Sequence, residues 1–433
     1  MTDTDTDTDY DALDFFRGTE TVADPYPYFD WLRGECPVRK EPRHGVYMVT
    51  GYDEAFSVYT DTDTFSSCNS VTGPFPGFPV TLEGQEDVDG LIEEHRAELP
   101  FSDQIITMDP PKHRDHRHLL MRQLTPKRLK ENEDFVWRLA DRQIDEFFGR
   151  GECELIGEYA TPFALFVIAD LLGVPEEDHG EFRRALGRQH GGGVGSTKSE
   201  MSLNPLEWLY DRFSLYIADR RRQPRDDVLT ALATTTFPDG ELPEVIDVVR
   251  VATNVFAAGQ ETTVRLLGSA LQILGDRPDL QRLLRERREL IPDFVEEALR
   301  MEAPVKGDFR LARCPANVGG VDIPAGGTVM VLNGAANRDP RRFADPGEFR
   351  VERGNAREHL AFGRGVHSCP GGPLARLETR VSIERLLDRT SDIRISEEHH
   401  GPPDARRYHY MPTYILRGLT ELHLELTPAG EAA

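Results

Sequence analysis

Long apolar runs are missing from this sequence of 433 residues. The longest candidate, residues 163–174, contains Asp170 and is shorter than the roughly 20 residues of a membrane-spanning helix, so we expect a core helix there. Residues 2–9 alternate Thr and Asp, without the basic and apolar regions of a signal peptide. We therefore predict a cytoplasmic protein with no membrane anchor, a disordered Thr/Asp tail over residues 1–20 and a single domain over residues 21–433.

Positive charge and cysteine are also scarce. The chain has 51 Lys and Arg against 75 Asp and Glu, a formal net charge of −24, which argues against nucleic acid as a partner. Its five cysteines have no paired spacing, which favours a reducing compartment and leaves a thiol free to bind a metal.

Residues 112–130 reverse this charge balance. We call them the basic window, because they contain seven Lys or Arg and only one acid, Asp115. Such a window indicates either a docking surface for an acidic partner or an ordinary solvated helix face. Its basic residues are Lys112, Arg114, Arg117, Arg122, Lys127, Arg128 and Lys130.

Helical periodicity dominates the remainder, so we predict a mainly α fold with small β-sheets. Alternation and β-branched residues predict a few short strands, and Pro and Gly around position 325 predict a hairpin that joins residues 321–323 to 328–332. The expected helices cover residues 24–32, much of 111–236, 243–275, 292–301 and 374–387, and the other expected strands cover 45–50, 414–416 and 419–426.

One cysteine, Cys369, lies in a glycine-rich loop just before the apolar run 374–387. Gly363, Gly365 and Gly371 would let the backbone approach a flat partner closely. A cysteine at the start of a helix has its pKa lowered by the exposed N–H groups and the helix dipole. A thiolate beneath a large planar group is what an axial haem ligand requires.

The loop resembles the haem-binding loop of the cytochrome P-450 family, in particular that of its soluble bacterial, actinobacterial members. The family pattern is matched at Phe362, Gly365, Cys369 and Gly371, and the triplet 374–376 also matches bacterial members. A cysteine phosphatase loop would need its arginine six positions after the cysteine, not seven, and a dinucleotide loop would need a third spaced glycine. The remaining alternative is a buried structural cysteine.

A second motif, Gly259, Glu261 and Thr262, lies about a hundred residues earlier within a predicted helix. Gly259 would let a ligand approach, and Thr262 can bond a carbonyl one turn back and open the helix locally. The resemblance implies that dioxygen binds here, that Thr262 holds it and that Glu261 relays protons.

A third motif pairs Glu297 with Arg300 at a spacing that places them on one helix face. The resemblance implies that an arginine from the loop before the cysteine, best matched by Arg353, joins them in a structural network. Arg350 stands where relatives often have an acid, so a rearranged network is the alternative at this position.

Four basic residues match the positions with which the family binds the two haem propionates: His113, Arg117, Arg310 and His367. Surface histidines are the alternative for His113 or His367 taken singly. The resemblance covers nearly the whole chain, from about residue 24 to residue 426.

The resemblance implies a cytochrome P-450 fold that holds haem b (heme b, iron protoporphyrin IX) through Cys369, with Phe362, Gly259 and Gly371 also contacting it. The implied activity is hydroxylation of a hydrophobic small molecule with dioxygen and two electrons. Because the chain has no flavin or iron–sulfur segment, a ferredoxin and a ferredoxin reductase are implied as partners. A peroxide-driven peroxygenase and a non-enzymatic haem ligand-binding protein are the alternatives, and the Glu261–Thr262 pair disfavours both.

The substrate is the least determined part. Segments 71–107, 165–205, 255–258, 305–309 and 408–414 are expected to form its pocket. They favour an apolar or aromatic ligand such as a terpenoid, a steroid or a fatty acid. The pocket residues that we predict from them are Phe75, Phe78, Phe256, Val305 and Phe309.

Overall fold

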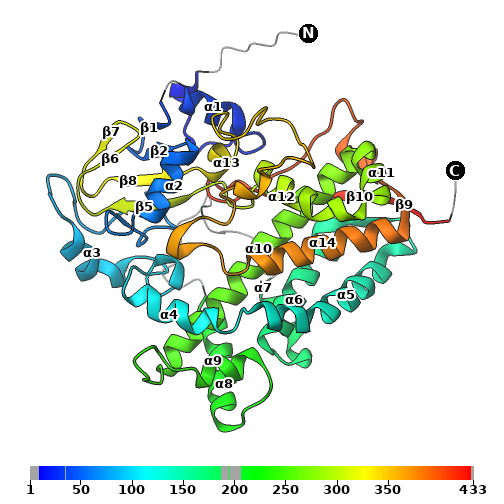
Figure 1. Cartoon of the computed structure of the whole chain (residues 1–433), viewed down its shortest axis with the longest axis horizontal. Helices are drawn as coiled ribbons and strands as arrows, with labels where there is room; N and C mark the ends of the chain where they lie inside the picture. Colours follow the sequence, from blue (N-terminus) through cyan, green and yellow to red (C-terminus); the bar gives the residue numbers. More distant parts are fainter. Residues whose placement is uncertain (1–8, 35, 187–194, 196–205, 431–433) are drawn as a thin grey trace.

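The computed structural model describes residues 9–34, 36–186, 195 and 206–430, in which helices fill most of the volume and small sheets lie at its edges (Figure 1). The longest helix, α10 (Val245–Asp276), runs through the middle of the molecule and packs against α6 (Thr161–Leu172), α8 (Glu207–Arg222) and α14 (Gly372–Arg389). Most buried apolar side chains belong to the core around these helices. The predicted mainly α fold with small sheets is confirmed.

Local sequence signals explain where several helices begin and end. Thr125 caps α5 (Pro126–Phe148) by accepting a hydrogen bond from the backbone N–H of Arg128 at 3.3 Å, and proline occupies the first turn. Helix α6 ends at Gly173, whose φ of +89° is strained for any residue with a side chain. The other helices are α1 (Tyr26–Arg33), α2 (Tyr52–Thr60), α3 (Asp89–His95), α4 (Lys112–Met121), α7 (His179–Leu186), α9 (Val228–Thr234), α11 (Pro278–Glu286), α12 (Ile291–Met301), α13 (Asn333–Ala336) and α15 (Glu397–His400).

The strands form a five-stranded sheet in the order β1-β2-β8-β5-β3, a three-stranded sheet β4-β10-β9 and the pair β6-β7. The predicted hairpin between residues 321–323 and 328–332 is wrong. Gly319 and Gly320, both with positive φ, turn the chain one step earlier, so that β7 pairs with β6, while β8 pairs with β2 and β5. The strands are β1 (Val38–Lys40), β2 (Tyr47–Val49), β3 (Phe65–Ser66), β4 (Glu152–Glu154), β5 (Asp308–Ala312), β6 (Ala316–Val318), β7 (Val321–Ile323), β8 (Thr328–Val331), β9 (Thr390–Ile395) and β10 (His423–Pro428).

The N-terminal segment is packed further towards its start than the sequence predicts. Phe15 and Phe16 are both buried, and the ring of Phe15 stacks on Tyr28 of α1 at 5.4 Å while that of Phe16 packs against Tyr414 at 5.3 Å. Residues 9–20 therefore belong to the folded structure, and the predicted tail boundary at residue 20 falls inside it, because this aromatic pair supplies apolar area that the Thr/Asp repeat lacks. Residues 1–8 lie outside the described part of the chain. Within the described part, no helix combines the length and apolar character needed to cross a membrane.

Candidate active site

The Cys369 loop connects a short 3₁₀ turn, Gly365–His367, to the start of α14. The backbone N–H of Cys369 donates to the carbonyl of Phe362 at 2.8 Å, which folds the loop back on itself. Gly365 is required here, because its φ is +71° and a Cβ atom would lie 2.6 Å from the carbonyl oxygen of Tyr59. Of the five cysteines, Cys369 is the exposed one, so its thiol is accessible to a ligand.

The sulfur of Cys369 has the surroundings of a metal-binding thiolate. Contrary to the lowering expected at the start of a helix, the pKa of this thiol is raised in the protein alone, because desolvation by the surrounding chain outweighs the backbone N–H groups of Gly371 and Gly372 and the charge of Arg117. Phe362 lies beside Gly372, and the guanidinium of Arg376 stacks on its ring at 4.6 Å. A metal cation bound to the sulfur would stabilise the negative charge of the thiolate.

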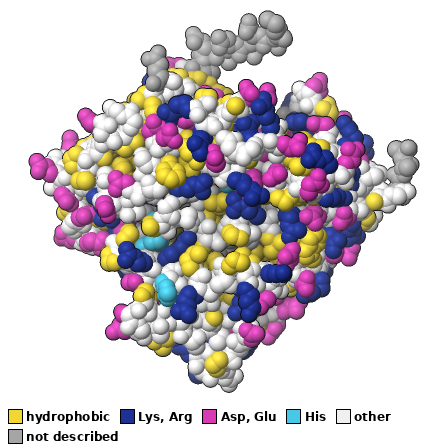
Figure 2. All heavy atoms as spheres, viewed as in Figure 1, with side chains coloured by type: hydrophobic (Ala, Val, Ile, Leu, Met, Phe, Trp, Pro, Cys, Tyr) yellow, Lys and Arg dark blue, Asp and Glu magenta, His cyan; other side chains and the backbone are white. Residues whose placement is uncertain are grey.

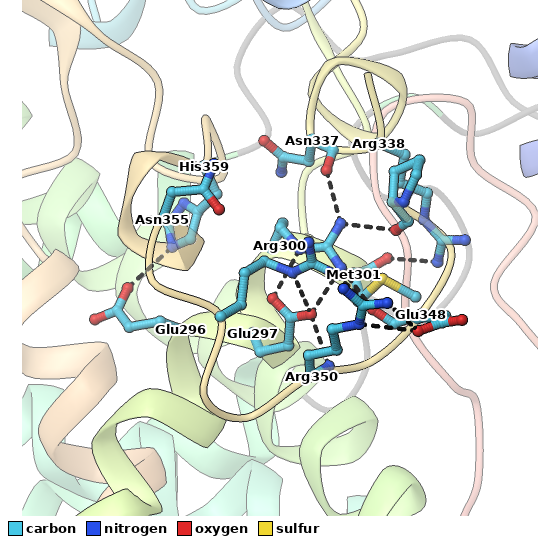
Figure 3. Close-up of polar contacts among 12 residues, drawn as sticks. Glu296, Glu297, Arg300, Met301, Asn337, Arg338, Glu348, Arg350, Asn355 and His359 are labelled. Carbon is cyan, nitrogen blue, oxygen red and sulfur yellow. Dashed lines mark hydrogen bonds and ion pairs between the residues drawn. The ribbon is translucent and has the colours of Figure 1, made fainter. Parts of the chain in front are cut away.

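Helix α12 holds the chain before this loop through Glu297 (Figure 3). The carboxylate of Glu297 accepts two hydrogen bonds from Arg300, both of 2.7 Å, and a third from Nε of Arg353 at 2.9 Å. The side chains of Glu297 and Arg300 are completely buried. The structure thus brings together the three residues that the resemblance assigned to one network, which we call the Glu297 network.

Arg350 leaves the Glu297 network intact. Its backbone N–H donates to Glu297 at 2.9 Å, whereas its side chain reaches outwards to Asp345 and Glu348, each at 2.6 Å. Because only the main chain of Arg350 faces inwards, the unusual side chain at this position does not require a rearrangement.

The neighbouring residue, Glu296, holds the chain on both sides of Cys369, and sequence analysis missed it. Its carboxylate accepts from Nε of Arg376 at 2.6 Å and contacts Nε2 of His359 at 3.1 Å, so it joins α14 to the segment before the loop. Although burial opposes the effect, hydrogen bonds with His359 and Arg376 lower the pKa of Glu296 to about 2. We call these three residues the Glu296 clamp. The signal was available in the adjacent acids at positions 296–297 and the arginine of the 374–376 triplet.

The four predicted propionate-binding residues lie beside the Cys369 loop and influence one another's charge. The rings of His113 and His367 have centroids 3.9 Å apart, and the buried Nε2 atoms of both have no hydrogen-bond partner in the described structure. Burial and the positive charges of Arg117 and Arg310 lower the pKa of His113 to about 4. Burial, then Arg310, His113 and Arg117, lower the pKa of His367 to about 2.

An anion would relieve this repulsion. Arg310 has one acidic neighbour, Asp308, at 3.3 Å, and Arg117 donates to the carbonyl of Ser368. Two unpartnered histidine nitrogens and two guanidinium groups beside a metal-binding thiol fit a flat metal cofactor that carries carboxylates, which is the composition of haem.

Glu261 and Thr262 lie in an unbroken part of α10. The hydroxyl of Thr262 donates to the carbonyl of Ala258 at 2.8 Å, as the sequence predicts, but the helix is not opened there. The carboxylate of Glu261 pairs with Arg265, one turn further along.

The structure assigns a different environment to Gly259 than the predicted haem contact. A Cβ atom at Gly259 would lie 3.2 Å from Cδ1 of Ile168 on α6. Glycine is therefore explained by the close packing of α6 on α10, and spacing alone could not distinguish this cause from the approach of a ligand.

The predicted pocket residues are divided among three apolar clusters. Phe256 is fully buried between Phe182 and Phe213, and Phe309 is fully buried in a cluster that also contacts Phe75 and Val305. Phe78 packs against a third cluster under α3. These aromatic side chains build the core, because a bulky apolar residue in a helix or strand serves packing as readily as ligand binding. Most of the predicted pocket segment after Leu186 lies outside the described residues.

Comparison with known proteins decides the family. The family model described as Cytochrome P-450 matches residues 216–403. Cytochrome P-450 144 of Mycobacterium tuberculosis is 35% identical over 96% of this chain and 91% of its own length. The chain belongs to the cytochrome P-450 family.

Further relatives agree over the full length. The 6-deoxyerythronolide B hydroxylase of Saccharopolyspora erythraea is 32% identical over 93% of this chain and 96% of its own length. The substrate-free structure of cytochrome P-450 CYP150A6 from Mycobacterium marinum is 62% identical, with a TM-score of 0.91 over 97% of this chain and 100% of that one. The protein is therefore a haem-binding cytochrome P-450 of the monooxygenase class, and the fold predicted from the resemblance is confirmed.

Proposed function

We propose that this cytochrome P-450 binds haem b through Cys369 and hydroxylates a hydrophobic small molecule with dioxygen and two electrons from a ferredoxin system. The proposal depends on Cys369, which is exposed and whose sulfur accepts hydrogen bonds from two backbone N–H groups. Hydrogen bonds to Glu296 and Glu297 hold the chain segments around it. When bound, the haem supplies the activation of dioxygen, and its propionates would be held by His113, Arg117, Arg310 and His367.

The residues of α10 would then handle protons. Thr262 donates its own hydrogen to Ala258, so its hydroxyl oxygen is left to accept a hydrogen bond. Glu261, charged and paired with Arg265, is the nearest acid along the helix and would exchange protons with solvent. A peroxygenase or a non-enzymatic haem protein has no need for such a pair.

The electron donor would meet the molecule on the cysteine side. Arg114 and Arg117 border a recess next to the exposed side chain of Val366, which follows Gly365 in the Cys369 loop. Lys and Arg side chains are interspersed with apolar ones over α4 and α14 on this face (Figure 2). A mixed basic and apolar surface suits an acidic ferredoxin.

The proposed substrate is a terpenoid, a steroid or a fatty acid, and two relatives support a hydrophobic small molecule in general. CYP109E1 of Bacillus megaterium, which is 26% identical with a TM-score of 0.76, has a structure in complex with testosterone. The hydroxylase named above acts on 6-deoxyerythronolide B, as its name states.

Replacement of Cys369 tests the proposal. The Cys369→His variant is expected to lose the long-wavelength carbon monoxide band of ferrous haem thiolate, while serine at Cys36, Cys68, Cys153 or Cys314 is expected to keep it. Retention of the band in Cys369→His would refute the ligand assignment. Turnover with ferredoxin and reductase, compared with peroxide alone, distinguishes the monooxygenase from the peroxygenase and from a protein that only binds ligands.

A further inference from the structure

Lys306 is a buried lysine without an acidic partner among the described residues. The residue is 4% exposed, and the one described hydrogen bond of its side chain runs from Nζ to the backbone carbonyl of Thr413. No carboxylate among the described residues forms an ion pair with it. An ammonium group has three N–H donors, so two remain for another acceptor.

Lys306 lies where two loops meet α10. Its backbone N–H donates to the carbonyl of Ile415 at 2.7 Å, and Val305 bridges to Leu416, so the loop before β5 runs along residues 413–417. The same C-terminal loop reaches α10, where Met411 contacts Arg265 at 2.9 Å. Arg265 in turn pairs with Glu261, beside Thr262, so Lys306 belongs to the side of the molecule where we propose that oxygen chemistry occurs.

The charges that affect the pKa of Lys306 are positive. Burial and the positive charges of Arg417 and Arg265 lower the pKa of Lys306 to about 7. Both arginines already have acids of their own, because Arg417 pairs with Glu302 and Arg265 pairs with Glu261. Because its pKa is about 7, Lys306 is charged in only part of the molecules at neutral pH, and an arriving anion would favour the charged form.

We propose that Lys306 binds the carboxylate of an otherwise apolar substrate, a proposal that rests on the monooxygenase function proposed above. The two free N–H donors of its ammonium group would receive the carboxylate, while Thr413 keeps the third. The surrounding side chains, among them Phe15 at 5.8 Å from Nζ, are apolar, so only the charged end of the ligand would find polar partners. Such an anchor orients one end of the substrate and limits which C–H bonds can be attacked.

The test compares each acid with its own methyl ester. Dodecanoate and methyl dodecanoate represent the acyl chain, and a steroid carboxylic acid and its methyl ester represent a polycyclic skeleton. Binding to the haem-loaded protein is followed by the haem spin-state change and by calorimetry. We expect at least one of the two acids to bind at least tenfold more tightly than its ester, and the pair that shows the preference identifies the skeleton.

Variants of Lys306 assign the preference to this residue. Lys306→Met keeps the length of the side chain without its charge and is expected to bind acid and ester equally, while Lys306→Arg keeps the preference. Lys40→Met, at an exposed position, is the control and should match the wild type. If Lys306→Met does not take up haem, Lys306→Gln replaces it.

The outcomes separate this proposal from the proposed function. Equal binding of acid and ester by the wild type for both skeletons, or a preference that survives in Lys306→Met, would overturn the carboxylate site even if the carbon monoxide band is normal. A wild type without that band would overturn the haem-thiolate function itself.

Discussion

Two regions of this cytochrome P-450 use charge in opposite ways. On the cysteine side, Glu296 and Glu297 are buried and each accepts hydrogen bonds from at least two partners, so positive and negative groups compensate one another at short distance. On the α10 side, the ammonium group of Lys306 donates to a carbonyl, and the charges that lower its pKa are those of Arg417 and Arg265. The first arrangement keeps a loop in one position, whereas the second is completed only by a ligand.

The largest expected effect is on the Glu297 network. Glu297→Gln leaves the completely buried guanidinium of Arg300 and the neighbouring Arg353 without their carboxylate, so the free energy of unfolding should fall by about 3–5 kcal/mol. Urea unfolding measures it. Glu352→Gln, which breaks an exposed pair with Arg287, is the matched control and should leave the free energy of unfolding nearly unchanged. Similar losses of unfolding free energy in both variants would show that burial does not account for the contribution of the Glu297 network.

Substitutions in the motif of α10 should change chemistry and leave stability nearly unchanged. Glu261 is partly exposed and Thr262 bonds only within its own helix, so neither supports distant elements. Thr262→Ala should keep haem content and substrate binding but divert reducing equivalents to hydrogen peroxide. Glu261→Gln should slow turnover by roughly 10²-fold, the lower end of general acid–base contributions. An unchanged ratio of product to reducing equivalent in Thr262→Ala would remove that residue from the proposed role.

This contrast also explains what could be read from the sequence. The Cys369 loop and the Glu297–Arg300 pair are local patterns whose spacing reflects their geometry, so the sequence located them. The Glu296 clamp was missed because its partners lie 63 and 80 residues further along the chain. Lys306 was also missed, because its lack of an acidic partner is a property of the tertiary structure that no spacing of residues in the sequence indicates.

The predicted pocket residues are spread over separate clusters for a related reason. Aromatic residues were chosen by segment, yet Phe256 and Phe309 are fully buried in different clusters. Likewise, Gly259 packs against Ile168, and the wrong hairpin followed from taking Pro and Gly near residue 325 as the turn when the turn lies at Gly319 and Gly320. Which of several apolar or turn residues is used depends on tertiary contacts that periodicity does not contain.

A third prediction uses pH to test whether Glu296 is charged in the folded protein. The pKa of Glu296 is about 2 in the folded chain, against about 4.3 for an unperturbed glutamate, so its contribution is fully present above pH 4.5 and is lost as the pH falls towards 2. We expect this loss to amount to about 1–2 kcal/mol, because Arg376 is partly exposed and its charge is screened. Denaturant unfolding between pH 5 and pH 3 should therefore show a shallower pH dependence for Glu296→Gln than for the wild type. Parallel curves would mean that the clamp is not charged in the folded protein.

The smallest expected effect concerns the basic window, and it tests whether the cysteine side also receives the electron donor. Arg114 and Arg122 are exposed and form no ion pair with described residues, whereas Lys127 faces Glu131 at 3.7 Å and Arg128 faces Asp226 at 3.8 Å.

Charge reversal by Arg114→Glu or Arg122→Glu should therefore slow electron transfer from an acidic ferredoxin several-fold at low salt, and more than Lys127→Glu or Arg128→Glu, whose charges are already partly neutralised. The effect should act on the association rate and should shrink at 1 M salt, where the screening length falls to about 3 Å. Stopped-flow reduction at both salt concentrations measures it. An equal loss at low and high salt would indicate a damaged fold, and no loss at either would place the donor on another face.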